Sequence, residues 1–340
     1  MERRKVIYMP YIRRLVSTNQ YINNMMDILR VKYEVVRIEE ISTDIKKIMQ
    51  VKAIFLNWIE DQLSLDTKYR LILYKCLGVK IIWVFHNRAP HDKSNVVGMR
   101  NMKWLAWISD YIVCHSKDSI RYLPVKWFQR KCRYIPHPYY EIPHMMGKLD
   151  DKREDKDIFT FGLIGFIRPF KNIELLIRAF LELDLPHVGL LIVGNVEASN
   201  TEYAQSLKDM CSGCKNIVIE FKFIAEQKMK DELGKIDILV LPYNKKSSMN
   251  SGAMILALSF GKPVIIPDIS MAVDMQDQEF VYMYHYETEK EHLENLKYCM
   301  RLAVEKGKRE NYRIGKKAVA FIKEFNSKNN IIEGFKTMGL

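Results

Sequence analysis

The chain has 340 residues, of which 48% are hydrophobic and 28% charged, which suits a folded globular protein longer than one ordinary core. No apolar run approaches the roughly 20 residues of a membrane-spanning helix, and no signal peptide is visible at the N-terminus. The net charge is +12, and the excess lies in residues 1–140, which carry 25 Lys and Arg against 12 Asp and Glu (+13), whereas residues 141–340 carry 28 against 29 (−1). This excess predicts an anionic partner for that half (nucleic acid, anionic lipid or a phosphorylated substrate), unless it only keeps the surface soluble.

Residues 1–140 alternate short apolar runs with amphipathic ones, which is the pattern of repeated βα units. In chain order, the runs predict strands over residues 5–9, 33–38, 53–56, 79–85, 111–114 and 134–135, with helices over residues 19–30 and 67–77. Apolar strands in this order are typical of a parallel sheet covered by helices. We therefore expect residues 1–140 to form one Rossmann-like domain.

Residues 141–157 differ from both halves, because they combine Pro, Gly and a dense run of charges without hydrophobic periodicity. We interpret this segment as a linker. Asp155 and Asp157 form a D-x-D pattern that a metal site could use, but within a charged run we expect both carboxylates to be solvated.

The second half begins its own βα series. We expect strands over residues 159–164, 188–193, 217–221, 236–241 and 264–266, and helices over residues 174–183, 203–210, 225–233, 251–260, 289–306 and 309–324. The predicted fold class is α/β, with two doubly wound parallel-sheet domains facing a cleft: residues 158–305 form the second domain, and residues 306–340 form a helical segment that packs back on the first. Ligands are expected beyond the carboxyl ends of the strands.

One candidate anion site is the segment FGLIGFIRPFKN, residues 161–172. An apolar run ends at Gly165, a turn carries Arg168 and Lys171, and an amphipathic segment follows. Backbone N–H groups at a helix start, together with two cations, suit a polyanion such as a diphosphate. The alternative is an ordinary βα connection with solvated charges.

A second candidate is PYNKKSSMNSGAMILALSFGKP, residues 242–263. A strand ends near Tyr243, a polar loop runs to Asn250, and Ser251-Gly252 opens an apolar helix. Gly252 allows a ligand to approach the backbone, and Ser251 offers a hydroxyl and an N–H group. The alternative is a plain Ser N-cap.

Several other chemistries lack their sequence motifs. Neither G-x-G-x-x-G nor G-x-x-x-x-G-K-[ST] occurs, which argues against dinucleotide oxidoreductases and P-loop nucleotidases. Cys211 and Cys214 form a C-x-x-C without the second pair that a zinc site needs. We expect six reduced cysteines and a cytoplasmic protein.

The two candidate segments, with LLIVGN between them, resemble the donor-binding domain of GT-B-fold glycosyltransferases, above all family-4-like bacterial enzymes of surface-polysaccharide synthesis. The resemblance covers about residues 159–270 well and the first half in outline. It implies that Lys171 binds the donor diphosphate. Arg168 stands two residues past the position where the family keeps its Arg, which is Phe166 here.

The resemblance is to a Ser-Gly subgroup, because the family's paired Glu positions are Ser248 and Leu256 here. It implies that Asn250, Ser251 and Gly252 face the sugar or diphosphate. Gly165 and Tyr243 complete the expected donor-binding set. No metal and no cofactor beyond the nucleotide-sugar co-substrate is expected.

His86 follows the predicted strand at residues 79–85, and the resemblance places a His there. Its imidazole suits proton transfer near neutral pH, so we predict His86, Arg168 and Lys171 as the catalytic set. The alternative is a surface His in a loop. His115 and His137 also follow strands, but we rank them lower.

Residues 103–107 (KWLAW) and 126–131 (KWFQRK) mix Trp with cations. This mixture suits an anionic membrane surface, or buried aromatics on amphipathic helices. Single-stranded nucleic acid would use similar residues, but no known nucleic-acid-binding motif occurs and we expect no nucleic-acid partner.

Together these features predict a glycosyltransferase that moves a sugar from a nucleotide-diphosphate donor to an oligosaccharide or polyprenyl-linked acceptor. We expect the basic first domain to bind the acceptor and the protein to lie in the cytoplasm, peripherally on the inner face of the membrane. The alternative is a non-catalytic interaction protein on the same fold, or else a nucleic-acid-binding protein.

Overall fold

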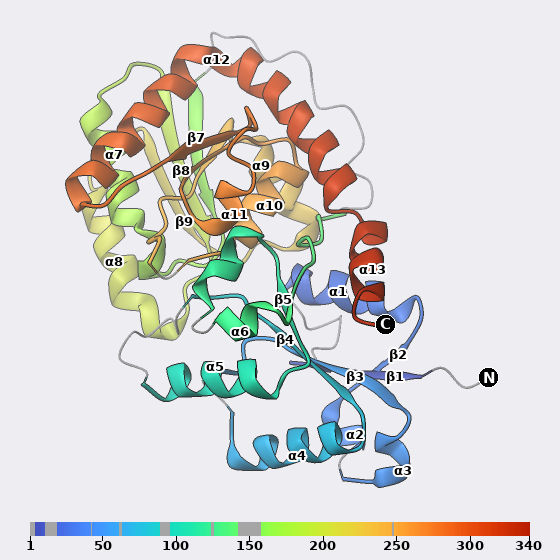
Figure 1. Cartoon of the computed structure of the whole chain (residues 1–340). Coiled ribbons are helices and arrows are strands. Elements are labelled where there is room, and N and C mark those ends of the chain that lie inside the picture. The colour runs from blue at the N-terminus through green and yellow to red at the C-terminus, as the bar shows by residue number, and fades with distance from the viewer. Residues whose placement is uncertain are drawn as a thin grey trace. The chain divides into compact units, whose positions relative to one another are not determined.

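The structure is a computed structural model that describes residues 4–10, 19–41, 43–60, 63–88, 96–123, 126–141, 158–246 and 248–340. The chain divides into two compact units. Unit 1 comprises Met1–Tyr140 and Phe325–Leu340, and unit 2 comprises Glu141–Glu324. The expected linker at 141–157 lies outside the described residues, apart from Glu141. Figure 1 shows both units.

Unit 1 is built on a six-stranded sheet with the order β2-β1-β3-β4-β5-β6. Every neighbouring pair is parallel. The strands are β1 (Lys5–Met9), β2 (Glu34–Val36), β3 (Val51–Leu56), β4 (Lys80–Val84), β5 (Tyr111–Cys114) and β6 (Cys132–Tyr134). The order reverses between β1 and β3, so the carboxyl ends of these two strands flank the switch point of the sheet.

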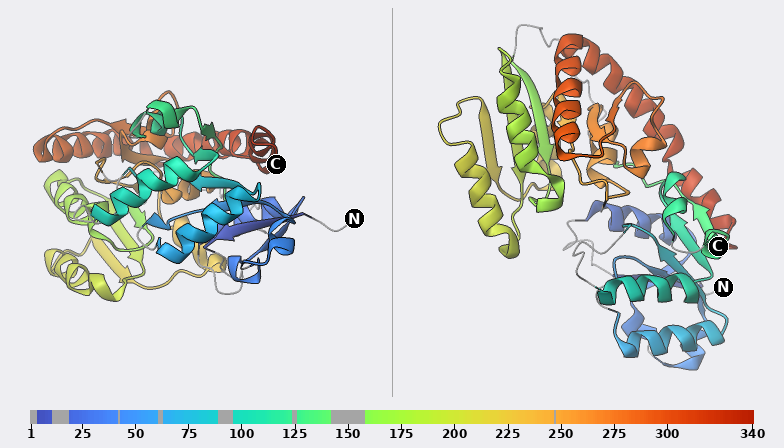
Figure 2. Two further views of the ribbon diagram at one scale, coloured as in Figure 1. Left: turned by 60° about the horizontal axis from the view of Figure 1, so that its bottom comes forward. Right: turned by 60° about the vertical axis from the view of Figure 1, so that its left-hand side comes forward.

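The helices of unit 1 cover both faces of its sheet (Figures 1 and 2). They are α1 (Gln20–Arg30), α2 (Ile38–Ile41), α3 (Ile45–Ile48), α4 (Leu65–Cys76), α5 (Val96–Ile108), α6 (Lys126–Gln129) and α13 (Lys328–Lys336). α1 and α13 pack together on one face, where Met25, Phe55 and Phe335 belong to one buried cluster. The last helix of the chain therefore completes the core of the first unit.

Unit 2 holds a second six-stranded parallel sheet, with the order β12-β11-β10-β7-β8-β9. The strands are β7 (Phe159–Ile164), β8 (Val188–Gly194), β9 (Ile217–Phe221), β10 (Ile238–Val240), β11 (Val264–Pro267) and β12 (Val281–Tyr284). The chain leaves β7 toward β8 and β9, and later returns to β10 on the other side of β7. The switch point of this sheet therefore lies between β7 and β10.

The helices of unit 2 are α7 (Ile173–Leu183), α8 (Thr201–Met210), α9 (Met229–Gly234), α10 (Gly252–Ser259), α11 (Ser270–Val273) and α12 (Glu289–Phe325). α7, α8 and the first part of α12 share one buried cluster with the sheet. α12 is broken at Gly307, whose φ of 74° lies in the left-handed region that glycine tolerates. The break agrees with the two helices expected at 289–306 and 309–324.

The predicted fold class, a doubly wound parallel α/β architecture, is confirmed in both units. Some local elements differ from the prediction. The strand expected at 33–38 ends at Val36, because Ile38 already opens α2. The helix expected at 225–233 is a 3-10 turn followed by the short α9. Neither β12 nor α5 was predicted, whereas α13 lies within the helical segment expected at residues 306–340. Among the described residues, no helix combines the length and apolarity that crossing a membrane requires.

Candidate functional site

The first candidate site lies at the carboxyl edge of the second sheet, beside the switch point between β7 and β10. β7 ends at Ile164, and Gly165 follows with a φ of 112°, a conformation that favours glycine. A 3-10 turn over Pro169–Lys171 then leads through Asn172 into α7. The predicted order of strand, turn and helix is confirmed.

Lys171 is the buried cation of this edge. Its side chain folds back over Gly165, since a Cβ placed on that glycine would lie 3.2 Å from the Lys171 Nζ. Burial, aided by the nearby charge of Arg168, lowers the Lys171 pKa to about 7. Among the described residues, no hydrogen-bond acceptor or carboxylate pairs with its Nζ. An anion placed here would supply the missing counter-charge.

The turn after β7 is joined to the loop after β10. Asn172 has a φ of 50°, and its Nδ2 donates to the Pro242 carbonyl at 3.0 Å. In the other direction, the backbone N–H of Asn244 donates to the Phe170 carbonyl at 3.1 Å. These two bonds bring the segments 161–172 and 242–263 together, which sequence alone did not place in contact.

The second segment is built around Ser251, the N-cap of α10. Its Oγ accepts the Met254 N–H at 3.0 Å and donates to the Tyr243 hydroxyl at 3.2 Å. Burial raises the pKa of Tyr243 to about 12. Gly252 is the first residue of α10, and Asn250 lies just before the cap. The Ser251 hydroxyl is therefore already hydrogen-bonded within the protein. The backbone N–H at Gly252 is the group with which this segment can bind a ligand.

Arg168 is held by a partner that the sequence analysis missed. Its Nε and Nη2 contact the two carboxylate oxygens of Glu197 at 3.0 and 2.6 Å. Glu197 follows β8 by three residues, so a carboxylate just past a neighbouring strand was the available signal. The bidentate pair neutralises Arg168, and the diphosphate-binding role of Arg168 stays a prediction.

The second candidate site lies at the carboxyl edge of the first sheet. His86, His115 and His137 follow β4, β5 and β6, and all three rings pack around Tyr21 of α1, with centroids 5.2, 5.3 and 4.9 Å away. The alternative that His86 is a surface residue is wrong, because its side chain is only 6% exposed. The sequence did not predict that these three histidines lie together, or that Tyr21 contacts all of them. His91, five residues after His86 in the sequence, lies outside the described residues.

Each imidazole of this cluster is hydrogen-bonded. His86 Nε2 lies 3.0 Å from Asn57 Oδ1, and His115 Nε2 lies 2.8 Å from the Tyr21 hydroxyl. Burial lowers the pKa of His115 to about 4 and that of His137 to about 3, and it lowers the His86 pKa well below its usual value. All three rings are therefore neutral at pH 7.

His86 is also fixed by Trp58. The two rings stack with centroids 4.0 Å apart and an interplanar angle of 17°. Trp58 has a φ of 47°, which is rare for a bulky residue and is often found at functional sites. Asn57, beside it, donates its Nδ2 to the Met9 carbonyl at 3.0 Å, so the ends of β1, β3 and β4 are tied together.

The two edges allow different chemistry. The edge of unit 2 offers a buried cation and a helix N-terminus, which together suit a diphosphate. The edge of unit 1 offers a neutral imidazole that can accept or donate a proton. Among the described residues, no three His, Cys, Asp or Glu side chains are grouped as a metal site would need.

No family model matches the chain. A curated relative, the GDP-mannose:glycolipid 4-beta-D-mannosyltransferase of Xanthomonas campestris pv. campestris, is 25% identical over 202 residues, which are 58% of this chain and 52% of that protein. The same enzyme from a second strain of that pathovar matches equally. The chain thus spans about half the length of the curated relatives it matches.

Solved structures match over nearly the whole chain. Anabaena HepE in complex with UDP and glucose has a TM-score of 0.70 at 12% identity, covering 99% of this chain and 100% of that one. The sucrose-phosphate synthase of Thermosynechococcus elongatus has a TM-score of 0.69 at 12% identity, covering 99% and 98%. These matches show the fold: two parallel six-stranded sheets with flanking helices, as in GT-B glycosyltransferases.

Proposed function

We propose that the chain is a glycosyltransferase that moves a sugar from a nucleotide-diphosphate donor to an oligosaccharide or lipid-linked acceptor. The observation that carries this proposal is Lys171, a buried cation without a described counter-ion, next to the switch point of a Rossmann-like sheet. The 25% identical relative is named as a mannosyltransferase that uses GDP-mannose and a glycolipid, which supports the same chemistry.

Lys171 would act on the leaving group. When the bond between the sugar and the diphosphate breaks, negative charge grows on the diphosphate, and an ammonium fixed in a buried site stabilises that charge more than the ground state. The backbone at the start of α10, from Ser251 and Gly252, would bind the same phosphates. With these groups in place, we propose that transfer requires no metal ion.

His86 would act on the acceptor side of the reaction. Its imidazole is neutral and held by Asn57 and Trp58, so it is oriented to hydrogen-bond a sugar hydroxyl or to accept its proton. We propose that unit 1 binds the acceptor, as its excess of positive charge suggests for a phosphate-linked lipid or oligosaccharide.

We also propose that unit 1 docks on an anionic membrane surface through α5 and α6, from the cytoplasmic side. Trp107 and Trp127 are 59% and 55% exposed, which argues against a core role for these two rings, and Trp104 is half-buried. Lys131 lies 4.8 Å from the Trp127 ring centroid and binds the carbonyls that end α5. Exposed Trp beside cations suits the boundary between lipid headgroups and acyl chains.

A donor screen tests the proposal. We expect saturable thermal stabilisation by one nucleotide-sugar among UDP-, GDP-, ADP- and CMP-sugars, with GDP-mannose and UDP-glucose tested first. Transfer to a lipid-linked oligosaccharide should follow with that donor only. The second candidate, a non-catalytic protein on this fold, is favoured by the Arg168–Glu197 pair, which removes one cation from the donor site. Absence of stabilisation by every donor would favour that second candidate.

A further inference from the structure

A pocket of about 240 Å³ lies at the amino edge of the first sheet, at the opposite ends of the strands from the histidine cluster. It is lined by residues that precede or begin adjacent strands, together with the end of α4: Arg4, Met49, Gln50, Val51, Lys52, Leu77, Gly78 and Lys80. None of these residues belongs to the donor site or to the histidine cluster described above.

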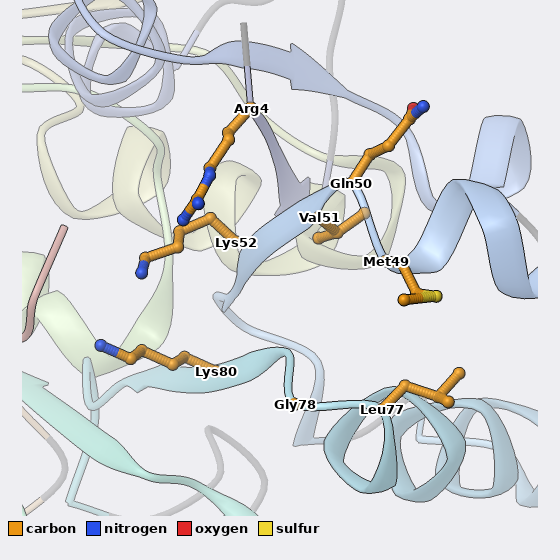
Figure 3. Close-up of a pocket in the computed structure, with 8 residues that line it drawn as sticks. All are labelled: Arg4, Met49, Gln50, Val51, Lys52, Leu77, Gly78 and Lys80. Carbon is orange, nitrogen blue, oxygen red and sulfur yellow. The ribbon is translucent and has the colours of Figure 1, made fainter.

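Three cations gather in this pocket because of the strand order. Arg4 directly precedes β1, Lys52 is the second residue of β3, and Lys80 begins β4. β1, β3 and β4 are neighbours in the sheet, and neighbouring strands lie about 4.8 Å apart. Figure 3 shows the nitrogen-bearing ends of the three side chains directed to one side of the pocket, with Met49 and Leu77 on the other.

These charges lack counter-ions in the described part of the chain. No described carboxylate pairs with the Arg4 guanidinium or the Lys52 ammonium. Lys80 Nζ donates one hydrogen bond to the Met338 carbonyl at 2.7 Å, which leaves two of its three N–H groups. Burial lowers the pKa of Lys52, and the charges of Lys80 and Arg4 lower it further. Like charges held this close repel one another until an anion joins them.

The geometry points to a second anion site in unit 1, in which Arg4, Lys52 and Lys80 bind a small phosphate-bearing group. The volume lies below the roughly 300–1,000 Å³ of sites that enclose whole drug-sized ligands, so the pocket suits a phosphate or diphosphate rather than a complete nucleotide-sugar. Arg4 supplies planar donors for two phosphate oxygens, and the lysines supply point charges. The group would come from a free anion or from the headgroup of a lipid.

Titration with inorganic phosphate and diphosphate tests this site, at constant ionic strength against sodium chloride. The Lys171→Met background removes the cation of the proposed donor site, so that remaining saturable binding that depends on Arg4 and Lys52 belongs elsewhere. We expect that binding to persist in Lys171→Met and to weaken at least tenfold when Arg4→Gln and Lys52→Gln are added. The charge-matched control is Lys230→Gln with Arg301→Gln, two exposed cations of unit 2, and it should bind as before.

A second arm separates the two sources of the phosphate. Vesicles of phosphatidylcholine with and without phosphatidic acid are compared, using the same variants. Saturable binding of the free anions, sensitive to Arg4→Gln/Lys52→Gln, supports a soluble ligand. If Arg4→Gln/Lys52→Gln weakens only the binding to vesicles that contain phosphatidic acid, the ligand is a lipid headgroup. Binding that is absent, or equal in the double variant and its control, would overturn the site.

Discussion

The carboxyl edges of the two sheets bury basic side chains in opposite ways. At the edge of unit 1, three imidazoles are buried, hydrogen-bonded and neutral at pH 7. At the edge of unit 2, Lys171 is buried with a pKa of about 7 and no described counter-ion. Burial lowers the pKa in both places, but only Lys171 is left with an unsatisfied charge. The first edge thus carries no unpaired charge at pH 7, whereas the second is prepared for an anion.

The largest expected effect comes from removing the cation of unit 2. Lys171→Met keeps the length of the side chain, and we expect transfer to fall about 100- to 1,000-fold, as when one fixed donor to a developing anion is removed. Because the variant no longer buries a charge, its free energy of unfolding should not decrease. Turnover with the preferred donor and the midpoint of urea unfolding measure the two quantities.

Lys230→Met is the matched control for that variant, since Lys230 is an exposed lysine of the same unit. It should retain wild-type turnover. Equal turnover in Lys171→Met and Lys230→Met would contradict the role of Lys171, and a large loss of stability in Lys171→Met would mean that the lysine holds the fold instead.

The next largest effect is a loss of stability of unit 1 at acidic pH. The folded-state pKa of each cluster histidine lies below the unfolded value of 6.5, so below pH 6.5 the unfolded chain binds more protons and stability is lost as the pH falls. Together the three histidines should lower the free energy of unfolding by about 3 kcal/mol between pH 6.5 and 5.5. All five tryptophans lie within residues 1–140, so tryptophan fluorescence during urea unfolding measures this unit.

His137→Gln sharpens the acid experiment, because it removes one of the three titrating rings while keeping a polar side chain beside the Pro138 carbonyl. The loss of stability over the same pH interval should shrink by about a third. An unchanged pH dependence would show that the cluster does not set the acid sensitivity of unit 1.

A smaller effect is expected at the junction of the two donor-site loops. Asn172→Ala removes the bond to Pro242 and places alanine at a φ of 50°, which costs about 1–2 kcal/mol. Asn172→Gly loses the same bond without the backbone cost. We expect both variants to raise the donor KM several-fold, and the alanine variant to unfold at lower urea than the glycine variant. Equal urea midpoints would mean that the left-handed conformation is not maintained in solution.

The smallest effect is expected at Asn57, which positions His86 in unit 1. Asn57→Ala removes one hydrogen bond to the imidazole, worth about 1 kcal/mol, and should lower kcat about fivefold. Asn57→Asp places a carboxylate there and should raise the pKa of His86, which moves the acid limb of the pH profile of kcat upward. A merely structural Asn57 would change stability in both variants and leave that limb in place.

The sequence predicted most strands and the donor-site turn because those signals are local. The run of apolar residues before Gly165 and the cations after it identify a strand and a turn without knowledge of the rest of the chain. The switch point did not follow from such patterns, since it depends on which strands pair. β12 was not predicted because it is a short run of only four residues, Val-Tyr-Met-Tyr, with weak periodicity.

The histidine cluster shows where sequence reasoning stops. His86, His115 and His137 each follow a strand, and parallel strands end at one edge, so their proximity could have been inferred. Their burial could not, because it depends on Tyr21 and Trp58, which come from other segments. The pairing of Arg168 with Glu197 likewise depends on how two loops meet. Tertiary contacts determine the burial of these histidines and the partner of Arg168, and local sequence patterns do not contain them.

The most direct test of the account is the proton linkage of donor binding at Lys171. The intact nucleotide-sugar is used, because its diphosphate diester does not itself titrate near pH 7. Calorimetry at pH 7 in two buffers of different ionisation enthalpy should show uptake of about 0.5 proton per donor bound, and affinity should fall up to about tenfold per pH unit above pH 7. Lys171→Met should abolish both effects. Donor binding without proton uptake, at an affinity that Lys171→Met leaves unchanged, would contradict the account.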